Sequence, residues 1–278
     1  MTNSSSKSNP RQLRLIAFNI LEGLRPVKPA ANERRLVDRD RAKAVRELVD
    51  EYQPDFLALN EALYCRIFAD KKVNYSHLFK FPHHECALYD DAWGNAILSK
   101  HPIIHSSEMR IYNRGGLIIE THTNSGPLTI ASYHPHPARY PENKAEDFAA
   151  LVEGIKGPVI ICGDFNCISP DDTIDYPALT KAFASFSTDP KSTLDRFIES
   201  GKQVFSRLEQ LGFHDAIPKA GRRYSIPTDL LNRDKSSAMR IDHILVNDKI
   251  KVLSGEVIHS DASNRASDHH PVMIDFSL

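Results

Sequence analysis

The pair Asp164 and Asn166 combines a carboxylate and an amide, two residues apart, directly after an apolar stretch. Residues 159–162 are all apolar, which predicts a buried strand, and Gly163 then permits a sharp turn. A carboxylate can bind a metal or take a proton, and an amide both donates and accepts hydrogen bonds. Taken alone, such residues more often shape a turn. Their interpretation therefore depends on whether the pattern recurs.

The same arrangement recurs elsewhere in the chain. An apolar stretch leads to Asn19, Glu61 and His134, contains Asp242, and follows shortly after Asp268 and His269. Each alone has an ordinary explanation, such as a solvated carboxylate or a hydrogen-bonded structural amide. Asp242 differs, because a carboxylate inside an apolar strand needs a histidine or arginine partner. Together, carboxylate and amide oxygens favour a hard cation, Mg²⁺ or Mn²⁺, over zinc, and the histidines suit charge stabilisation or proton transfer.

Strands and helices of ordinary length would position these residues. Strands are predicted at residues 13–20, 55–61, 94–100, 103–111, 117–122, 128–134, 159–162, 240–246, 252–259 and 272–276. Helices are predicted at residues 34–51, 143–155, 178–186 and 194–211. The pattern over residues 64–89 is ambiguous, and residues 260–267 read as a polar loop. Without an internal repeat, we expect one domain over residues 11–278 after a disordered tail over residues 1–10.

The composition excludes several classes of protein. The 278 residues carry 35 basic and 36 acidic side chains, so no strongly positive field is available to hold long nucleic acid. The four cysteines form no Cys-x-x-Cys pair, which argues against a zinc ribbon and a disulfide scaffold. The polar N-terminus lacks a signal-peptide core, and no apolar run approaches transmembrane length. We therefore expect a monomer in the reducing cytoplasm.

The chain lacks a serine nucleophile elbow and a glycine-rich phosphate loop. Instead, its motifs resemble those of the endonuclease/exonuclease/phosphatase superfamily, which has the deoxyribonuclease I-like fold. The matching pieces, in the family's order, are Phe18-Asn19-Ile20, residues 54–61, residues 94–100, Tyr133-His134, residues 163–166, Arg240-Ile241-Asp242 and residues 267–272. They span nearly the whole chain after residue 10. Each motif is weak alone, but together they are specific for the superfamily.

The resemblance implies an α+β fold, a four-layer α/β/β/α sandwich of two packed, mostly antiparallel sheets flanked by helices. It also implies hydrolysis of a phosphoester with Mg²⁺ or Mn²⁺. Carried over by position, Glu61 would be the principal metal ligand, with Asn19 beside it. Asp268 would support the metal or its waters.

The same resemblance assigns the catalytic roles. Asp164 would orient or deprotonate the attacking water, and Asn166 would hold a phosphate oxygen. His269 would face the scissile phosphate, steadied by Asp242, and His134 would be a second phosphate-facing histidine. A carboxylate behind an imidazole fixes its tautomer and favours its cation, which is consistent with this assignment.

The sequence departs from the family pattern at two places. Asn60 stands where a glutamine usually precedes the metal-binding glutamate, a change that we expect to be tolerated. Residues 133–137 stand where the family more commonly has a strand that ends in His-Leu. Either His134 or His136 could therefore face the site, and His134 is preferred because it ends the strand.

The loops decide the substrate, because the core chemistry is shared by the superfamily. We expect a phosphodiesterase of nuclease type acting on DNA or RNA. The alternatives are an enzyme for a small phosphorylated molecule or lipid head group, and a non-catalytic binding protein. A loop carrying Arg222, Arg223 and Tyr224, with Arg233, Lys235 and Arg240 downstream, is either a phosphate-binding rim or a solvated surface. Trp93 either stacks on a base or packs internally.

Overall fold

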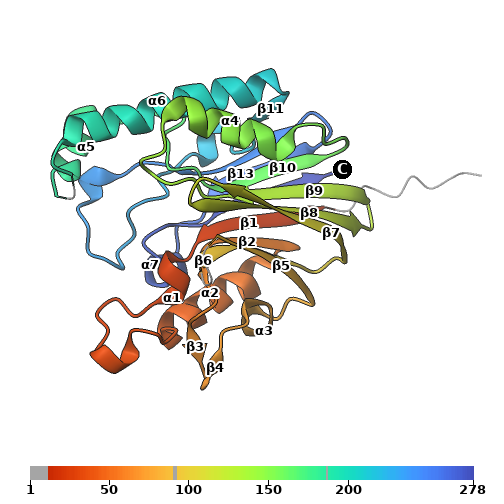
Figure 1. Ribbon diagram of the computed structural model, residues 1–278, viewed down its shortest axis with the longest axis horizontal. Coiled ribbons are helices and arrows are strands. Elements are labelled where there is room, and N and C mark those ends of the chain that lie inside the picture. The colour runs from red at the N-terminus through yellow and green to blue at the C-terminus, as the bar shows by residue number, and fades with distance from the viewer. Residues whose placement is uncertain (1–11, 90–92, 186) are drawn as a thin grey trace, which may run out of the picture.

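Two six-stranded sheets pack face to face in the computed structural model, which describes residues 12–89, 93–185 and 187–278 (Figure 1). The first sheet has the order β13 (Lys251–Val257), β14 (Val272–Ser277), β1 (Leu13–Asn19), β2 (Phe56–Leu63), β6 (Trp93–Ser99) and β5 (His83–Leu88). The second has the order β11 (Phe213–Asp215), β12 (Asp242–Asn247), β10 (Val159–Asp164), β9 (Gly126–Tyr133), β8 (Arg114–Thr123) and β7 (Ile103–Ile111). The expected tail over residues 1–10 lies outside the described residues.

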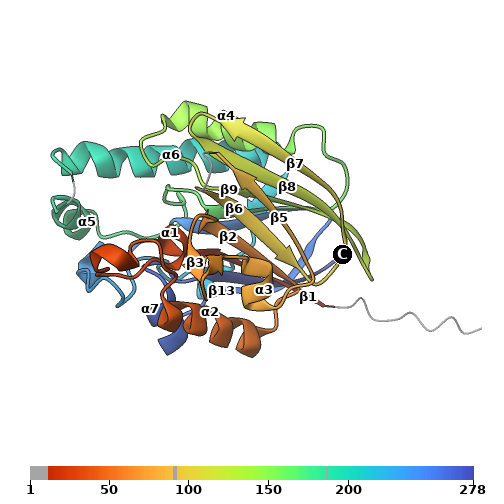
Figure 2. The ribbon, with the colours of Figure 1, turned by 60° about the horizontal axis from the view of Figure 1, so that its bottom comes forward.

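Helices cover the outer face of each sheet and complete the four layers (Figures 1 and 2). The first sheet is covered by α2 (Arg39–Tyr52) and α3 (Tyr75–Phe79), and the second by α4 (Pro141–Val152) and α6 (Pro190–Gln210). The shorter elements are α1 (Leu21–Leu24), α5 (Tyr176–Phe183), α7 (Asp261–Ala266), the hairpin of β3 (Ile67–Phe68) and β4 (Lys71–Lys72), and the 3₁₀ turns Ala31–Glu33, Lys219–Gly221 and Lys235–Ser237. Only β1–β2 and β9–β10 pair in parallel among the described strands, so the expected mostly antiparallel sandwich is confirmed.

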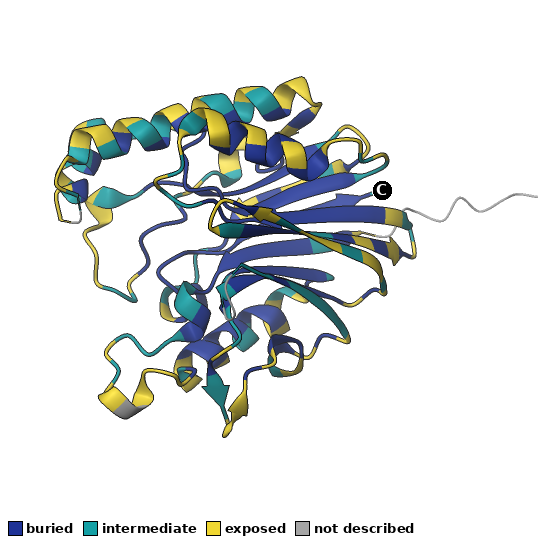
Figure 3. Ribbon diagram, viewed as in Figure 1, coloured by how far each residue is buried: buried dark blue, intermediate teal, exposed yellow. Residues whose placement is uncertain are grey.

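The central strands are apolar because both of their faces are buried, as the dark ribbon at the centre of Figure 3 shows. In β1, Leu15 and Ala17 face the core between the two sheets. Ile16 and Phe18 face the helices beneath the first sheet. The continuous apolar pattern that predicted the strand therefore reflects two separate cores on its two sides.

Several predicted boundaries were wrong by two or more residues, among them the starts of two helices and one strand. The helix expected from residue 34 begins at Arg39, because the Asp38 side chain accepts hydrogen bonds from the backbone of residues 40 and 41 and caps it there. The helix expected from residue 194 begins at Pro190, after the Asp189 cap. The strand expected from residue 240 begins at Asp242.

The loop expected over residues 260–267 contains the helix α7, which the sequence analysis missed. Ser260 and Ser263 exchange hydrogen bonds with each other's backbone, forming a capping box. Six residues are too few to show an apolar period, so only the caps signalled this helix.

The strand ends bring the candidate residues to one edge of the sandwich. Asn19 pairs with Asn60 across the first sheet, and Asp164 pairs with Asp242 across the second. Because β1, β2 and β10 end at this edge while β12 begins there, residues up to 223 positions apart share it. Within the described residues, no helix has both the length and the apolar character needed to cross a membrane.

Candidate active site

Asn19 connects the two sheets at the site. Its side-chain amide lies 3.2 Å from Glu61 Oε1 and donates at 3.0 Å to Asp164 Oδ2. Glu61 reaches this position because β2 carries an irregularity between Leu59 and Ala62, and its backbone adopts a φ of 56°. A left-handed backbone is costly for a glutamate and is typical of functional sites.

Asn60, the residue that departs from the family pattern, holds Asp164 in place. Its side-chain oxygen accepts a 2.8 Å hydrogen bond from the Asp164 backbone N–H. Its amide nitrogen donates at 2.8 Å to the side-chain oxygen of Asn95. The shorter asparagine therefore still joins the two sheets, and both of its side-chain groups are hydrogen-bonded.

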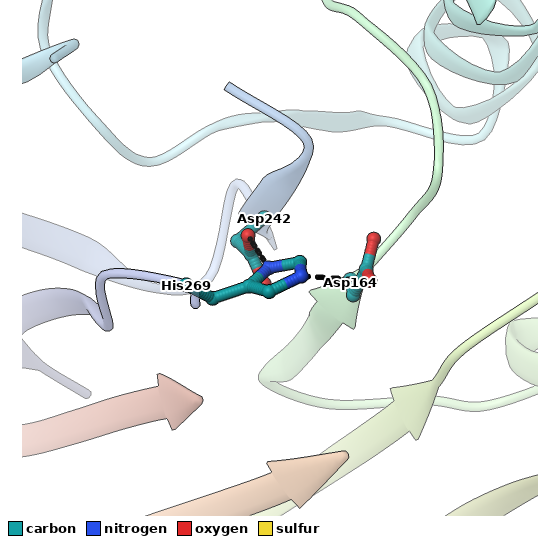
Figure 4. A group of neighbouring side chains, drawn as sticks. All are labelled: Asp164, Asp242 and His269. Carbon is teal, nitrogen blue, oxygen red and sulfur yellow. Dashed lines mark hydrogen bonds and ion pairs between the residues drawn. The ribbon is translucent and has the colours of Figure 1, made fainter. Parts of the chain in front are cut away.

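His269 lies between two carboxylates (Figure 4). Its Nδ1 is 2.7 Å from Asp242 Oδ2, and its Nε2 is 3.9 Å from Asp164 Oδ2. Burial alone would lower the pKa of His269, but the charge and hydrogen bond of Asp242, with the charges of Asp268 and Asp164, outweigh burial and raise it. The neighbouring carboxylates therefore favour the imidazolium form of His269.

Asp164 is buried at the centre of the site. Burial raises its pKa well above the usual range of an aspartate, and the nearby Asp242 carboxylate adds to the effect. The His269 cation and the hydrogen bonds from Asn166 and Asn19 oppose the rise. A carboxylate with a raised pKa is better suited to accept a proton near neutral pH than an ordinary aspartate.

Ser225 supports Asp242 from the loop that also carries Arg222, Arg223 and Tyr224. Its hydroxyl accepts hydrogen bonds from the backbone N–H groups of Ile241 and Asp242, at 3.0 and 3.2 Å. Its carbonyl accepts from the backbone of His270 at 2.6 Å. Ser225 thus connects the residues on both sides of the Asp242–His269 pair, and no sequence pattern marked it.

His134 approaches Asp164 from the opposite side. Its Nε2 lies 3.3 Å from Asp164 Oδ2, while its Nδ1 has no hydrogen-bond partner in the described part of the chain. Burial lowers the pKa of His134 well below its usual value, and the positive charges of Arg114 and His269 add to this. The lowered pKa favours the neutral form of His134, whose Nε2 faces the Asp164 carboxylate, whereas His136 contacts Tyr112.

Asn166 is held in a left-handed conformation, with a φ of 47°. Its backbone N–H donates to Asp164 Oδ1 at 2.9 Å, and its side-chain amide donates to the Pro135 carbonyl at 3.0 Å. Its carbonyl accepts a 2.8 Å hydrogen bond from Lys144, a fully buried lysine on α4. Lys144 was not predicted as a site residue, because a lysine on a helix with an apolar face is usually solvated.

Asp268 lies next to His269 and is paired across the site with Arg233, at 3.3 Å. Its charge acts on Glu61, whose pKa is raised by burial first and by Asp268 second. Beneath this group, the buried Arg41 donates to the backbone carbonyls of residues 20, 25 and 266 and ties the two neighbouring loops together.

Arg240 belongs neither to a phosphate-binding rim nor to a solvated surface, so both interpretations of its loop were wrong for this residue. It is buried and donates to Asp172 at 2.8 Å and to Asp215 at 2.6 Å. Arg222 contacts Asp171 and Asp215. Both arginines are paired with aspartates and therefore shape the loop.

A group that could hold a metal ion is present among the described residues. Asp164, Asp242 and His269 each offer one ligand atom, and these atoms lie within 4.8 Å of one another. His269 hydrogen-bonds Asp242 through Nδ1, so the ring nitrogen left for a metal is Nε2, which lies 3.9 Å from Asp164 Oδ2. The same row of carboxylate, imidazole and carboxylate can also handle protons.

The chemistry of the neighbouring donors fits a hard cation. Glu61, Asn19 and Asp268 offer oxygen atoms, which Mg²⁺ and Mn²⁺ prefer. A cation at Glu61 would also offset the two effects that raise its pKa, burial and the Asp268 charge.

The sequence model of the Endonuclease/Exonuclease/phosphatase family matches residues 16–269. This chain belongs to the endonuclease/exonuclease/phosphatase family. The resemblance seen in the sequence motifs is therefore confirmed. Members of this family are phosphoester hydrolases and commonly use divalent metals. A search of curated proteins found no match.

Solved structures of the endonuclease/exonuclease/phosphatase fold are similar to the whole chain. A family protein from Beutenbergia cavernae is 19% identical with a TM-score of 0.67, covering 96% of this chain and 72% of its own. The human Nocturnin catalytic domain with bound sulfate is 18% identical with a TM-score of 0.62, covering 96% and 94%. An AP endonuclease from Archaeoglobus fulgidus is 16% identical with a TM-score of 0.64, covering 96% and 100%. At these identities the likeness establishes the fold.

Proposed function

We propose that this protein is a Mg²⁺- or Mn²⁺-dependent hydrolase that cleaves a phosphodiester of DNA or RNA. The observation that carries the proposal is the line of contacts from Asp242 to His269, at 2.7 Å, and from His269 towards Asp164, at 3.9 Å. It places a cation and a carboxylate of raised pKa side by side at one buried point. A phosphoryl group and an attacking water need those two groups together.

Asp164 and His269 have different roles because one is a carboxylate and the other a histidine paired with a carboxylate. Asp164 orients the attacking water and takes its proton, with Asn19 and His134 holding the carboxylate. The His269 imidazolium, backed by Asp242, stabilises the charge that develops on the phosphoryl oxygens.

Asn166 and the metal ligands complete the site. Asn166 holds a phosphate oxygen, from a backbone that Lys144 fixes. Glu61, with Asn19 and Asp268 beside it, would hold the divalent ion, which neutralises phosphate charge and lowers the pKa of bound water.

One observation favours a nuclease over other phosphoesterases, and two further observations are compatible with it. One structural relative is named an AP endonuclease, and the family's name includes endonucleases and exonucleases. The motifs that match the family retain every proposed catalytic position. The near-neutral net charge of −1 suits a limited contact with nucleic acid better than a long duplex interface.

The test is a hydrolysis panel with added Mn²⁺ or Mg²⁺. We expect turnover of bis(p-nitrophenyl) phosphate and of DNA or RNA oligonucleotides, with activity lost in EDTA. Phospholipids, inositol phosphates and nucleotides form the other arms of the panel. Faster turnover of a phospholipid, an inositol phosphate or a nucleotide than of the oligonucleotides would identify that class of compound as the substrate. Inactivity toward every compound would favour a binding protein.

A further inference from the structure

Tyr112 is an exposed aromatic residue in an unusual backbone conformation. It lies at the tip of the β7–β8 hairpin, where Ile111 pairs with Arg114 and leaves a two-residue turn. Its φ is 56°, in the left-handed region that such turns normally fill with glycine or asparagine. The residue is nevertheless 72% exposed. A bulky, exposed side chain at a strained position is an indication of function rather than of packing.

The ring of Tyr112 is held by two neighbours. The guanidinium of Arg139 lies over the ring, 5.3 Å from its centroid, and His136 meets it edge-on at 6.5 Å. Arg139 is itself fixed by two 2.8 Å hydrogen bonds to the buried Asp147. We call Tyr112, His136 and Arg139 the Tyr112 platform. Because the platform is held in place, a planar partner would order few further side chains on binding.

The Tyr112 platform is attached directly to the proposed phosphate site. His136 follows His134, which contacts Asp164, by two residues. The intervening Pro135 carbonyl accepts the amide hydrogen bond from Asn166. The residues that would face the phosphate and the platform therefore belong to one short, rigid segment.

We propose that the Tyr112 platform stacks on a nucleobase adjacent to the cleaved phosphate, so that the substrate is single-stranded nucleic acid. The inference rests on the proposed function, because it supplies the base-binding part of the same site. Base–aromatic stacking tolerates every sequence and suits an exposed tyrosine face. A cationic lipid head group fits less well, because the positive charge of Arg139 at the ring repels a second cation but not a neutral base on the other face.

The test measures binding by fluorescence anisotropy, with every protein carrying Asp164→Asn to prevent turnover. The probes are a labelled six-residue oligothymidylate and a base-free oligomer with the same phosphates. Tyr112→Ala should weaken thymidylate binding about 5- to 100-fold, the range for loss of one stacked base, and change base-free binding less than about twofold. Tyr112→Phe should retain the binding, because the ring is kept. Tyr140→Ala is the matched control, since Tyr140 is 66% exposed on the neighbouring loop.

Three results would refute the proposal that the Tyr112 platform stacks on a base. They are an unchanged thymidylate affinity in Tyr112→Ala, equal losses for the two oligomers, and an equal loss in Tyr140→Ala. Displacement of the oligothymidylate by phosphatidylcholine vesicles would also point to a lipid partner instead. Hydrolysis of bis(p-nitrophenyl) phosphate by the wild-type protein tests the phosphoesterase proposal separately. If the protein binds the oligothymidylate more tightly than the base-free oligomer but does not hydrolyse bis(p-nitrophenyl) phosphate, the proposal for the Tyr112 platform stands and the phosphoesterase proposal fails.

Discussion

The two ends of strand β1 hold carboxylates in opposite electrostatic surroundings. Where the strand begins, Arg14 donates to Asp275 at 2.6 and 2.9 Å. Burial alone would raise the pKa of Asp275, but its hydrogen bonds, from Arg14 above all, outweigh burial and lower it. Where the strand ends, the neutral amide of Asn19 lies between Glu61 and Asp164, and burial raises the pKa of both carboxyl groups.

The difference shows which end is built for stability. An arginine partner makes the Asp275 carboxylate a favourable part of the folded state. At the other end an amide organises two carboxylates without neutralising them, so the cost of burying their charges is retained in the fold. Functional sites commonly carry such a cost, which is then relieved by a substrate or ion.

The largest expected effect is at the Asn19 end of the strand. Asp164→Asn should lower the turnover of bis(p-nitrophenyl) phosphate about 1000-fold or more, because it removes the group that takes the proton. Asp275→Asn, at the Arg14 end, should retain turnover in the same steady-state assay and serves as the control. Comparable rates for Asp164→Asn and the wild type would refute the role of Asp164.

The second prediction separates metal binding from stability. Glu61→Gln should weaken Mn²⁺ affinity at least about tenfold, as titration calorimetry can measure, because an amide is a poorer ligand for a hard cation. The same variant should melt at a higher temperature than the wild type without metal at pH 8. A raised folded-state pKa means that the ionised Glu61 destabilises the fold above that pKa, and glutamine removes this cost. A melting temperature of Glu61→Gln below that of the wild type would contradict the claim that the ionised Glu61 destabilises the fold.

Lys144 offers a test of positioning. Lys144→Met should lower kcat about tenfold with little change in KM, because Lys144 acts on the site through the carbonyl of Asn166 rather than on the substrate. Lys144→Arg should restore part of the loss, since it can still donate to that carbonyl. Equal losses in both variants, with lowered melting temperatures, would indicate a packing role alone.

The smallest expected effect is at the Arg14 end. Asp275→Asn should lower the free energy of unfolding by about 1 kcal/mol at pH 7. Since the folded-state pKa of Asp275 is lowered, its stabilisation is complete above about pH 4, the unfolded value, and is lost as the pH falls through the folded pKa. Urea titrations at pH 7, 4 and 3 should therefore show the gap between variant and wild type narrowing below pH 4. A gap that is independent of pH would exclude the ion pair as its cause.

The sequence predicted those parts of the fold and site that depend on local pattern. Central strands such as β10 are apolar on both faces, so their ends, and with them Asp164, could be located. The supporting contacts were not predictable, because they use backbone atoms of remote segments. Ser225 accepts from the backbone of residues 241 and 242, and Arg41 holds carbonyls that lie 21 and 225 residues away. Arg240 was misplaced for the same reason, since its partner Asp172 lies 68 residues away.

The position of β14 within the first sheet has a consequence for the timing of folding. The strand lies between β13 and β1, so residues as far apart in the sequence as Leu13 and Phe276 pair with each other. Asp268 and His269 lie a few residues before β14 and depend on that pairing for their placement. The candidate site can therefore be complete only after this long-range pairing has formed, whatever the order in which the local helices and hairpins fold.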